Sequence, residues 1–172
     1  MNFLRALSEL EQIEKTMAEL YAWCGGLFRG DPEAVDLFSH LRLEELSHQN
    51  ILDYERRIAL ANPRRFREIT VDSVVLEEKL QTVRRFMDAP SNPPLPEAVR
   101  AALEFEQSAA ELYYKSMAAH ASGELGRFIE HLHAGSTTHY ERLSQFALGR
   151  GLPLRKPDAQ QVPDGAPPRS AR

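Results

Sequence analysis

Two short strings of this sequence nearly repeat, and each is followed by a histidine at almost the same distance. The strings are EKTMAELY at residues 14–21 and EQSAAELY at residues 106–113, and each begins with glutamate and ends with tyrosine. His48 lies 34 residues after the first glutamate, and His139 lies 33 residues after the second. The repetition predicts that one helix-pair unit, carrying a carboxylate and an imidazole, has been used twice.

The residues just before the two histidines differ between the copies. The first copy has Glu45 three residues before His48, and a helix places two residues at this spacing on one face. The second copy has Ser136 three residues before His139. Borderline divalent ions such as iron and zinc bind carboxylate oxygens and imidazole nitrogens. The pattern therefore predicts a metal site in which the second copy has lost one carboxylate.

Apolar stripes mark the helices that must position these groups, because their steps alternate between four and three residues. Glu14, Glu45 and Glu106 each stand in such a stripe on a different helix. An unpaired buried carboxylate costs on the order of several kcal/mol, so three of them at core positions favour bound cations. We expect four long helices, at residues 2–28, 32–62, 96–121 and 124–148.

The connection between the second and third long helices covers residues 62–95, which is too long for a tight turn. Residues 72–88 are expected to form a short extra helix within it. A crossover of this kind joins neighbouring helices that run in the same direction. The predicted fold is therefore all-α, a four-helix bundle with a long crossover between helices 2 and 3.

Composition narrows the function classes. Residues 1–150 are expected to form one domain, and residues 151–172, which are rich in Pro, Gly, Gln and Arg, a disordered tail. The net charge of −4 gives no indication of a nucleic-acid or anionic-membrane partner. The single cysteine, Cys24, excludes an internal disulfide and favours a reducing compartment. No apolar run has the length of a signal peptide or a membrane span, so we expect a cytoplasmic protein.

At these residues the sequence resembles the rubrerythrin and ferritin-like family. The resemblance covers about residues 2–149 and lies in the two Glu-x6-Tyr strings, in Glu45-x-x-His48 and in the crossover. It implies a ferritin-like bundle, an antiparallel homodimer and bound iron. Rubrerythrins reduce peroxide at a di-iron centre, and related ferritins oxidise Fe(II). By this resemblance the metal ligands are Glu14, Glu45, His48, Glu106 and His139.

Three departures from the family pattern leave three functions in competition. Ser136 stands where the family has the glutamate of the second Glu-x-x-His, and Ala109 stands where rubrerythrins often carry an extra carboxylate. No Cys-x-x-Cys pair supplies a rubredoxin module. The first function is a redox enzyme acting with oxygen or peroxide, which needs an external electron donor. The second is a non-redox protein with a degenerate, perhaps mononuclear, iron or zinc site. The third is an interaction module without metal, against which the five surviving ligands argue.

Several neighbouring side chains offer alternatives or additions to this set. Glu44 is the alternative to Glu45, because it lies four residues before the histidine. His131 and His133 point about 80° and about 120° away from the ligand histidine of their helix, so we expect them at the surface. Tyr21 and Tyr113 lie two turns after their glutamates and are expected to donate hydrogen bonds above the cluster.

Overall fold

Helices are the regular secondary structure of the described part of the chain. A computed structural model describes residues 3–61, 73–109, 114 and 123–153, and within these ranges it contains no strand. The all-α class predicted from the sequence is therefore confirmed for this part. The α-helices are α1 (Phe3–Leu27), α2 (Pro32–Ala61), α3 (Ser73–Met87), α4 (Leu95–Ala109) and α6 (Gly123–Gly149).

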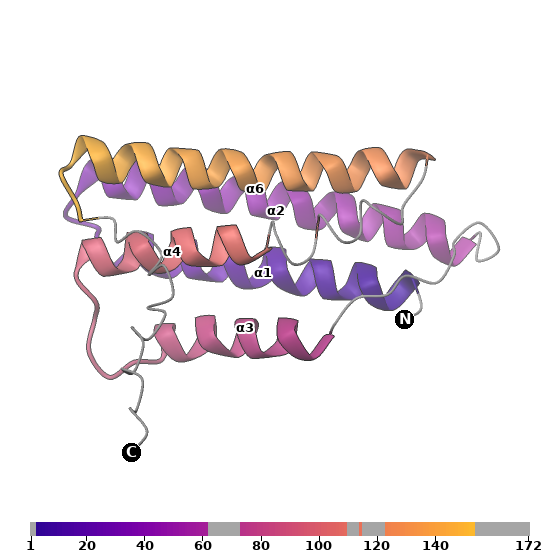
Figure 1. Ribbon diagram of the computed structural model, residues 1–172, viewed down its shortest axis with the longest axis horizontal. Coiled ribbons are helices and arrows are strands. Elements are labelled where there is room, and N and C mark those ends of the chain that lie inside the picture. Colours follow the sequence, from indigo (N-terminus) through magenta and orange to yellow (C-terminus); the bar gives the residue numbers. More distant parts are fainter. Residues whose placement is uncertain (1–2, 62–72, 110–113, 115–122, 154–172) are drawn as a thin grey trace, which may run out of the picture.

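Four of these helices run alongside one another in Figure 1, and α3 lies against α1. The pairs α1 with α2 and α4 with α6 pack most extensively. Helices α2 and α4 run in the same direction, and α1 and α6 run in the opposite direction (Figure 1). The short helix predicted at residues 72–88 is present as α3, between the two parallel helices in the chain.

Local sequence signals account for the start of α2 and the end of α6, which meet at one end of the molecule. Asp31 caps α2, since its Oδ1 accepts a hydrogen bond from the Ala34 amide at 3.2 Å, and Pro32 occupies the first helical position. Gly151 follows α6 with a φ of 62°, which suits a residue without a side chain. Arg150 then binds Asp31 at 3.0 Å, joining the end of α6 to the start of α2.

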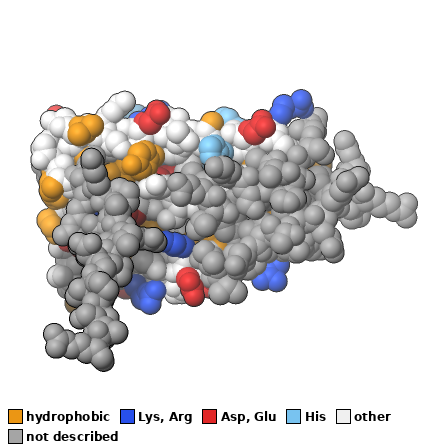
Figure 2. All heavy atoms as spheres, viewed as in Figure 1, with side chains coloured by type: hydrophobic (Ala, Val, Ile, Leu, Met, Phe, Trp, Pro, Cys, Tyr) orange, Lys and Arg blue, Asp and Glu red, His pale blue; other side chains and the backbone are white. Residues whose placement is uncertain are grey.

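The predicted apolar stripes form the core. Phe28 and Phe146, at the ends of two stripes, are only partly buried. No described helix has both the length and the apolar character needed to cross a membrane. On the face drawn in Figure 2, acidic, basic and hydrophobic side chains are interspersed over the described part. The buried stripe residues include Leu7, Leu10, Met17, Cys24, Phe38, Leu41, Leu52, Val99, Leu103, Leu132 and Leu143.

Some predictions fall outside the described residues. The third long helix was expected to reach residue 121, but α4 is described only to Ala109, and beyond it only Tyr114 is described up to residue 122. Most of the predicted tail, residues 154–172, also lies outside the described part. The helices that carry the five candidate ligands are described at all five positions.

Candidate metal centre

Three carboxylates and two imidazoles meet in the interior between α1, α2, α4 and α6. Helix α2 contributes two of them, and each of the other three helices contributes one. None of the five side chains belongs to a residue more than 7% exposed. The structure therefore brings together all the candidate ligands that the sequence singled out, Glu14, Glu45, His48, Glu106 and His139.

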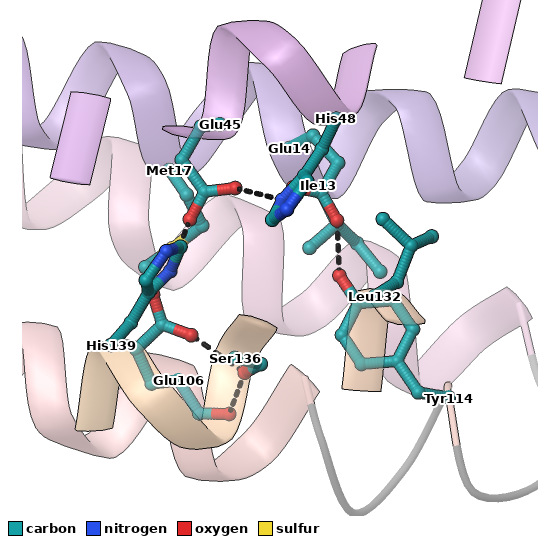
Figure 3. A pocket seen from close by; sticks show the side chains of 10 residues that line it. All are labelled: Ile13, Glu14, Met17, Glu45, His48, Glu106, Tyr114, Leu132, Ser136 and His139. Carbon is teal, nitrogen blue, oxygen red and sulfur yellow. Dashed lines mark hydrogen bonds and ion pairs between the residues drawn. The ribbon is translucent and has the colours of Figure 1, made fainter. Parts of the chain in front are cut away.

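Glu45 lies at the centre of this group, as Figure 3 shows. Its Oε1 forms an ion pair with Nδ1 of His139 at 3.0 Å, and its Oε2 accepts a hydrogen bond from Nδ1 of His48 at 3.3 Å. Two sets of possible ligand atoms share this carboxylate, and within each set the atoms lie within 4.8 Å of one another. The arrangement offers two adjacent positions for a metal ion with Glu45 between them.

The first position, here called the His48 position, consists of Glu14, Glu45 and His48. Nδ1 of His48 donates to Oε2 of Glu14 at 3.1 Å. The hydroxyl of Tyr114 donates to the other oxygen of Glu14 (Figure 3). The ring of His48 packs against Gly135 of α6, where an added Cβ would lie 2.8 Å from Cε1 of the histidine. Close packing therefore fixes this ring.

The second position, here called the His139 position, consists of Glu45, Glu106 and His139. Nδ1 of His139 donates to Oε1 of Glu106 at 3.3 Å, and the Tyr21 hydroxyl donates to the same oxygen. The other ring nitrogen of His139, Nε2, donates to Oε2 of Glu44 at 2.8 Å. Glu44 is thus an outer partner of a ligand, and the inward carboxylate of α2 is Glu45.

Ser136 takes the place of the missing carboxylate in a different role. Its hydroxyl donates to Oε2 of Glu106 at 2.6 Å and approaches the backbone oxygen of the same residue at 3.1 Å. A serine hydroxyl is neutral and a poor ligand beside a carboxylate, but here it orients one. Glu106 consequently receives hydrogen bonds on both of its oxygens, from Ser136 and from Tyr21.

Each buried tyrosine at the centre binds the glutamate of the other sequence copy. Tyr21, from the first copy, binds the glutamate of the second copy, as expected for a donor near the cluster. The other predicted donor, Tyr113, lies outside the described residues. The hydroxyl of Tyr114, which the sequence did not single out, binds Glu14. Tyr114 has a π-helical conformation, in which one extra residue per turn moves a side chain round the helix axis. A count based on an α-helix therefore could not identify Tyr114.

His131 and His133 stay outside the centre, as predicted. His131 is exposed and His133 is half-buried. The ring of His131 meets the ring of His48 edge-on, with 6.0 Å between their centroids. Among the described residues, neither belongs to a set of converging ligand atoms.

Burial and mutual contact shift the pKa values of the ligands. Burial, together with the charge of Glu45, raises the pKa of Glu14 to about 8. Burial alone would lower the pKa of His48, but its hydrogen bonds to Glu14 and Glu45 outweigh that effect and raise the pKa to about 9. The same opposition, with Glu106 and Glu45 as partners, raises the pKa of His139 to about 11.

The two carboxylates of α2 respond in the other direction. Burial would raise the pKa of Glu45, but its hydrogen bonds with Glu14, His139 and His48 lower it. Burial likewise opposes ionisation of Glu44, and Arg142 and His139 together lower its pKa. Without metal at pH 7, two imidazolium groups therefore face ionised Glu45, and Glu14 keeps its proton. Metal ions at both positions would replace these three protons.

The donor set fits a divalent metal by its chemistry. Carboxylate oxygens and imidazole nitrogens suit iron and zinc, and the outer carboxylate on His139 has the form of a carboxylate–histidine–metal arrangement. Comparison of the chain with protein-family models, with curated proteins and with solved structures finds no match. The geometry and chemistry of the centre therefore carry the functional argument.

Proposed function

We propose that this protein binds iron in a ferritin-like four-helix bundle, with up to two ions sharing Glu45. The observation that carries the proposal is the position of Glu45, whose two oxygens face different histidines and belong to both sets of ligand atoms. A buried carboxylate between two imidazoles, each with a further glutamate, fits a pair of divalent ions better than a purely structural network. A network with only a structural role would not need the further glutamate that accompanies each histidine.

The proposal predicts a distinctive stoichiometry in a set of isosteric variants. Glu45→Gln removes the shared ligand, so it should abolish tight binding at both positions. Glu14→Gln and Glu106→Gln should each leave one ion, since each removes a ligand from one position only. Glu104→Gln, at an exposed position of α4 two residues before Glu106, should bind as the wild type does.

The measurement is metal content per chain after loading with Fe(II) under anaerobic conditions, followed by gel filtration and elemental analysis. Circular dichroism of each variant verifies that it is folded. Unchanged metal content in Glu45→Gln would refute the shared site. Loading with Zn(II) in parallel distinguishes an iron protein from a site that also holds zinc.

Within this proposal, iron held by these carboxylates and imidazoles would supply redox chemistry toward oxygen or peroxide. The hydroxyl groups of Tyr114 and Tyr21 hold the carboxylates of Glu14 and Glu106 in place by hydrogen bonds. The single cysteine excludes a rubredoxin-type centre in this chain, so reducing electrons would come from another protein. Stopped-flow absorbance of the Fe(II)-loaded protein mixed with peroxide tests this activity.

The alternative is a binding protein without redox turnover, and Ser136 is the observation that favours it. Its hydroxyl donates a hydrogen bond to Oε2 of Glu106. A neutral donor therefore stands where the family has a second carboxylate that could bridge two ions. Stable Fe(II) after exposure to peroxide would select this alternative. The homodimer that the resemblance implies and the cytoplasmic location expected from the sequence are also part of the proposal, and light scattering after size exclusion tests the dimer.

A further inference from the structure

Glu44 and Arg142 form a surface pair that reaches one ligand of the centre from outside. Oε2 of Glu44 accepts the hydrogen bond from Nε2 of His139 at 2.8 Å, and Oε1 of Glu44 accepts one from the Arg142 guanidinium at 2.6 Å. The side chain of His139 is 2% exposed, whereas those of Glu44 and Arg142 are 39% and 42% exposed. The three residues thus lead from the interior to the surface.

The pair spans the contact between α2 and α6. Arg142 lies three residues after His139, so both side chains project from one face of α6. Glu44 comes from α2 and meets both of them. Each of its oxygens is bound to a different partner, which leaves the carboxylate little freedom to turn. An imidazole with one nitrogen held in this way can only rotate by breaking that bond.

The other histidine is held differently. The His48 ring has its Nε2 and Cε1 edge against Gly135, where a Cβ would lie 3.1 Å from Nε2. It contacts the small residue of the opposite helix rather than a charged pair. The two rings are stacked, with their centroids 5.9 Å apart, and their outer partners differ.

We propose that Glu44, held by Arg142, is the positioning residue that keeps Nδ1 of His139 directed at the centre and makes the His139 position the tighter of the two. This inference rests on the metal binding proposed above. Outer partners of metal-bound histidines typically contribute about 10- to 100-fold in affinity. Substitutions of Glu44 or Arg142 should leave no interior cavity, because both side chains line an open groove with Glu33, Asp36, Leu37 and Phe146.

The first experiment measures Co(II) affinity, by absorbance against a competing chelator, in backgrounds that keep a single position. In the Glu14→Gln background, which retains the His139 position, Glu44→Gln should weaken Co(II) binding about 10- to 100-fold. In the Glu106→Gln background, which retains the His48 position, the same change should alter affinity by less than about threefold. Equal effects in both backgrounds would overturn the proposal.

Two further variants separate a hydrogen bond from a simple loss of negative charge. Glu44→Asp keeps the charge but shortens the side chain, so it should weaken binding as Glu44→Gln does. Glu33 lines the same groove, and its carboxylate pairs with Arg150 and contacts none of the candidate ligands. Glu33→Gln therefore removes a negative charge from the groove and should leave the affinity for Co(II) unchanged. Wild-type affinity in Glu44→Asp would show that only charge matters and would overturn the positioning role.

Arg142→Gln tests whether the arginine acts through Glu44. Alone, this change should weaken Co(II) binding at the His139 position by up to about tenfold. In a Glu44→Gln background it should have no further effect, because its partner has been removed. Additive losses would mean that Arg142 acts independently of Glu44.

A metal-free measurement keeps this inference distinct from the proposed function. The ¹⁵N chemical shifts of the histidine rings report which ring nitrogen donates a hydrogen bond. Glu44→Gln should shift the Nε2 resonance of His139 and leave the resonances of His48 in place. If the wild type binds no metal, the proposed function fails, and these shifts still decide whether Glu44 positions His139. An unchanged His139 resonance would overturn the positioning role in either case.

Discussion

The two halves of the centre have nearly the same inner ligands but different surroundings. The His48 position is backed by close helix packing at Gly135, and its glutamate, Glu14, holds a proton at neutral pH. At the His139 position, Glu44 binds the histidine from outside, and Ser136 and Tyr21 each donate a hydrogen bond to one oxygen of Glu106. The comparison indicates that duplicated ligands need not give equivalent sites, because packing and hydrogen bonding control ring orientation separately.

The largest expected effect is a difference in pH dependence. Below about pH 8, an ion at the His48 position must displace two protons, since the pKa of Glu14 is raised to about 8 and that of His48 to about 9. An ion at the His139 position displaces the proton of His139, whose pKa is raised to about 11. Between pH 6 and 8, affinity should therefore rise more steeply with pH at the first position than at the second, where the rise should be about tenfold per pH unit.

Metal titrations of Glu106→Gln and Glu14→Gln across this pH range measure the contrast between the halves. The Glu106→Gln variant keeps the His48 position with both of its titrating groups, Glu14 and His48. The Glu14→Gln variant keeps the His139 position. Equal slopes in the two variants would contradict the unequal protonation of the halves. A flat profile in both would mean that the histidines are not ligands.

The same protons govern the stability of the metal-free protein. Each of the three raised pKa values means that the folded state holds protons that the unfolded state has released. Stability should therefore decrease as pH rises, beginning near pH 4.5 for Glu14 and near pH 6.5 for the two histidines. The fall should be steepest between about pH 6.5 and 8, where all three contribute, and should total several kcal/mol, to order of magnitude.

Urea unfolding in the presence of a chelator, at intervals from pH 5 to 9, tests this expectation. The free energy of unfolding should decrease over the range, whereas the metal-loaded protein should not lose stability in this way, because its ligands carry no protons. Glu14→Gln should flatten the curve between pH 5 and 8, since it removes the one carboxyl whose pKa is raised. A metal-free protein that became more stable with rising pH would contradict the assigned protonation.

The convergence of the five candidate ligands could be predicted from the sequence, because their positions follow helix periodicity. Glu45 and His48 are three residues apart on one stripe, and Glu14 and Glu106 are equivalent positions of a repeat. Their convergence requires only that four apolar stripes face a common interior. The all-helical class and the short helix α3 follow from the same pattern, whereas the ferritin-like bundle stays a prediction.

The outer contacts could not be predicted, because they depend on how one helix is rotated against another. Glu44 and His139 are 95 residues apart, and nothing in either local sequence indicates that they touch. The packing of Gly135 on His48 likewise depends on the distance between α2 and α6. Tyr114, whose hydroxyl binds Glu14, was not singled out from the sequence, because its conformation is π-helical and the count of positions assumed an α-helix. Such a departure from regular geometry leaves no periodic signal in the sequence.

A substitution at Gly135 should affect the His48 position selectively. In Gly135→Ala, the new Cβ would lie 2.8 Å from Cε1 of His48, so the ring or α6 must shift. Overpacking of this kind costs about 1–3 kcal/mol of stability. Metal affinity at the His48 position should fall about tenfold, with a smaller change at the His139 position.

Thermal unfolding measures the loss of stability, and Co(II) titration in the Glu106→Gln background measures the loss of affinity. Gly149→Ala, with open space around its Cβ, is the control. Full affinity in Gly135→Ala would show that close packing does not position His48.

The smallest expected change comes from restoring the carboxylate that the second copy lacks. In Ser136→Glu the new side chain would lie beside Glu106, to which the serine hydroxyl now donates at 2.6 Å. Without metal, the two carboxylates repel and one must take up a proton, so unfolding should require less urea above pH 6. With metal, the added charge should tighten binding at the His139 position up to about tenfold and speed the reaction of bound Fe(II) with peroxide. Ser136→Gln, which has similar size but no charge, is the matched control for crowding. If Ser136→Glu and Ser136→Gln bind metal equally, the missing carboxylate is not what limits this half of the centre, and its hydrogen-bonded surroundings are.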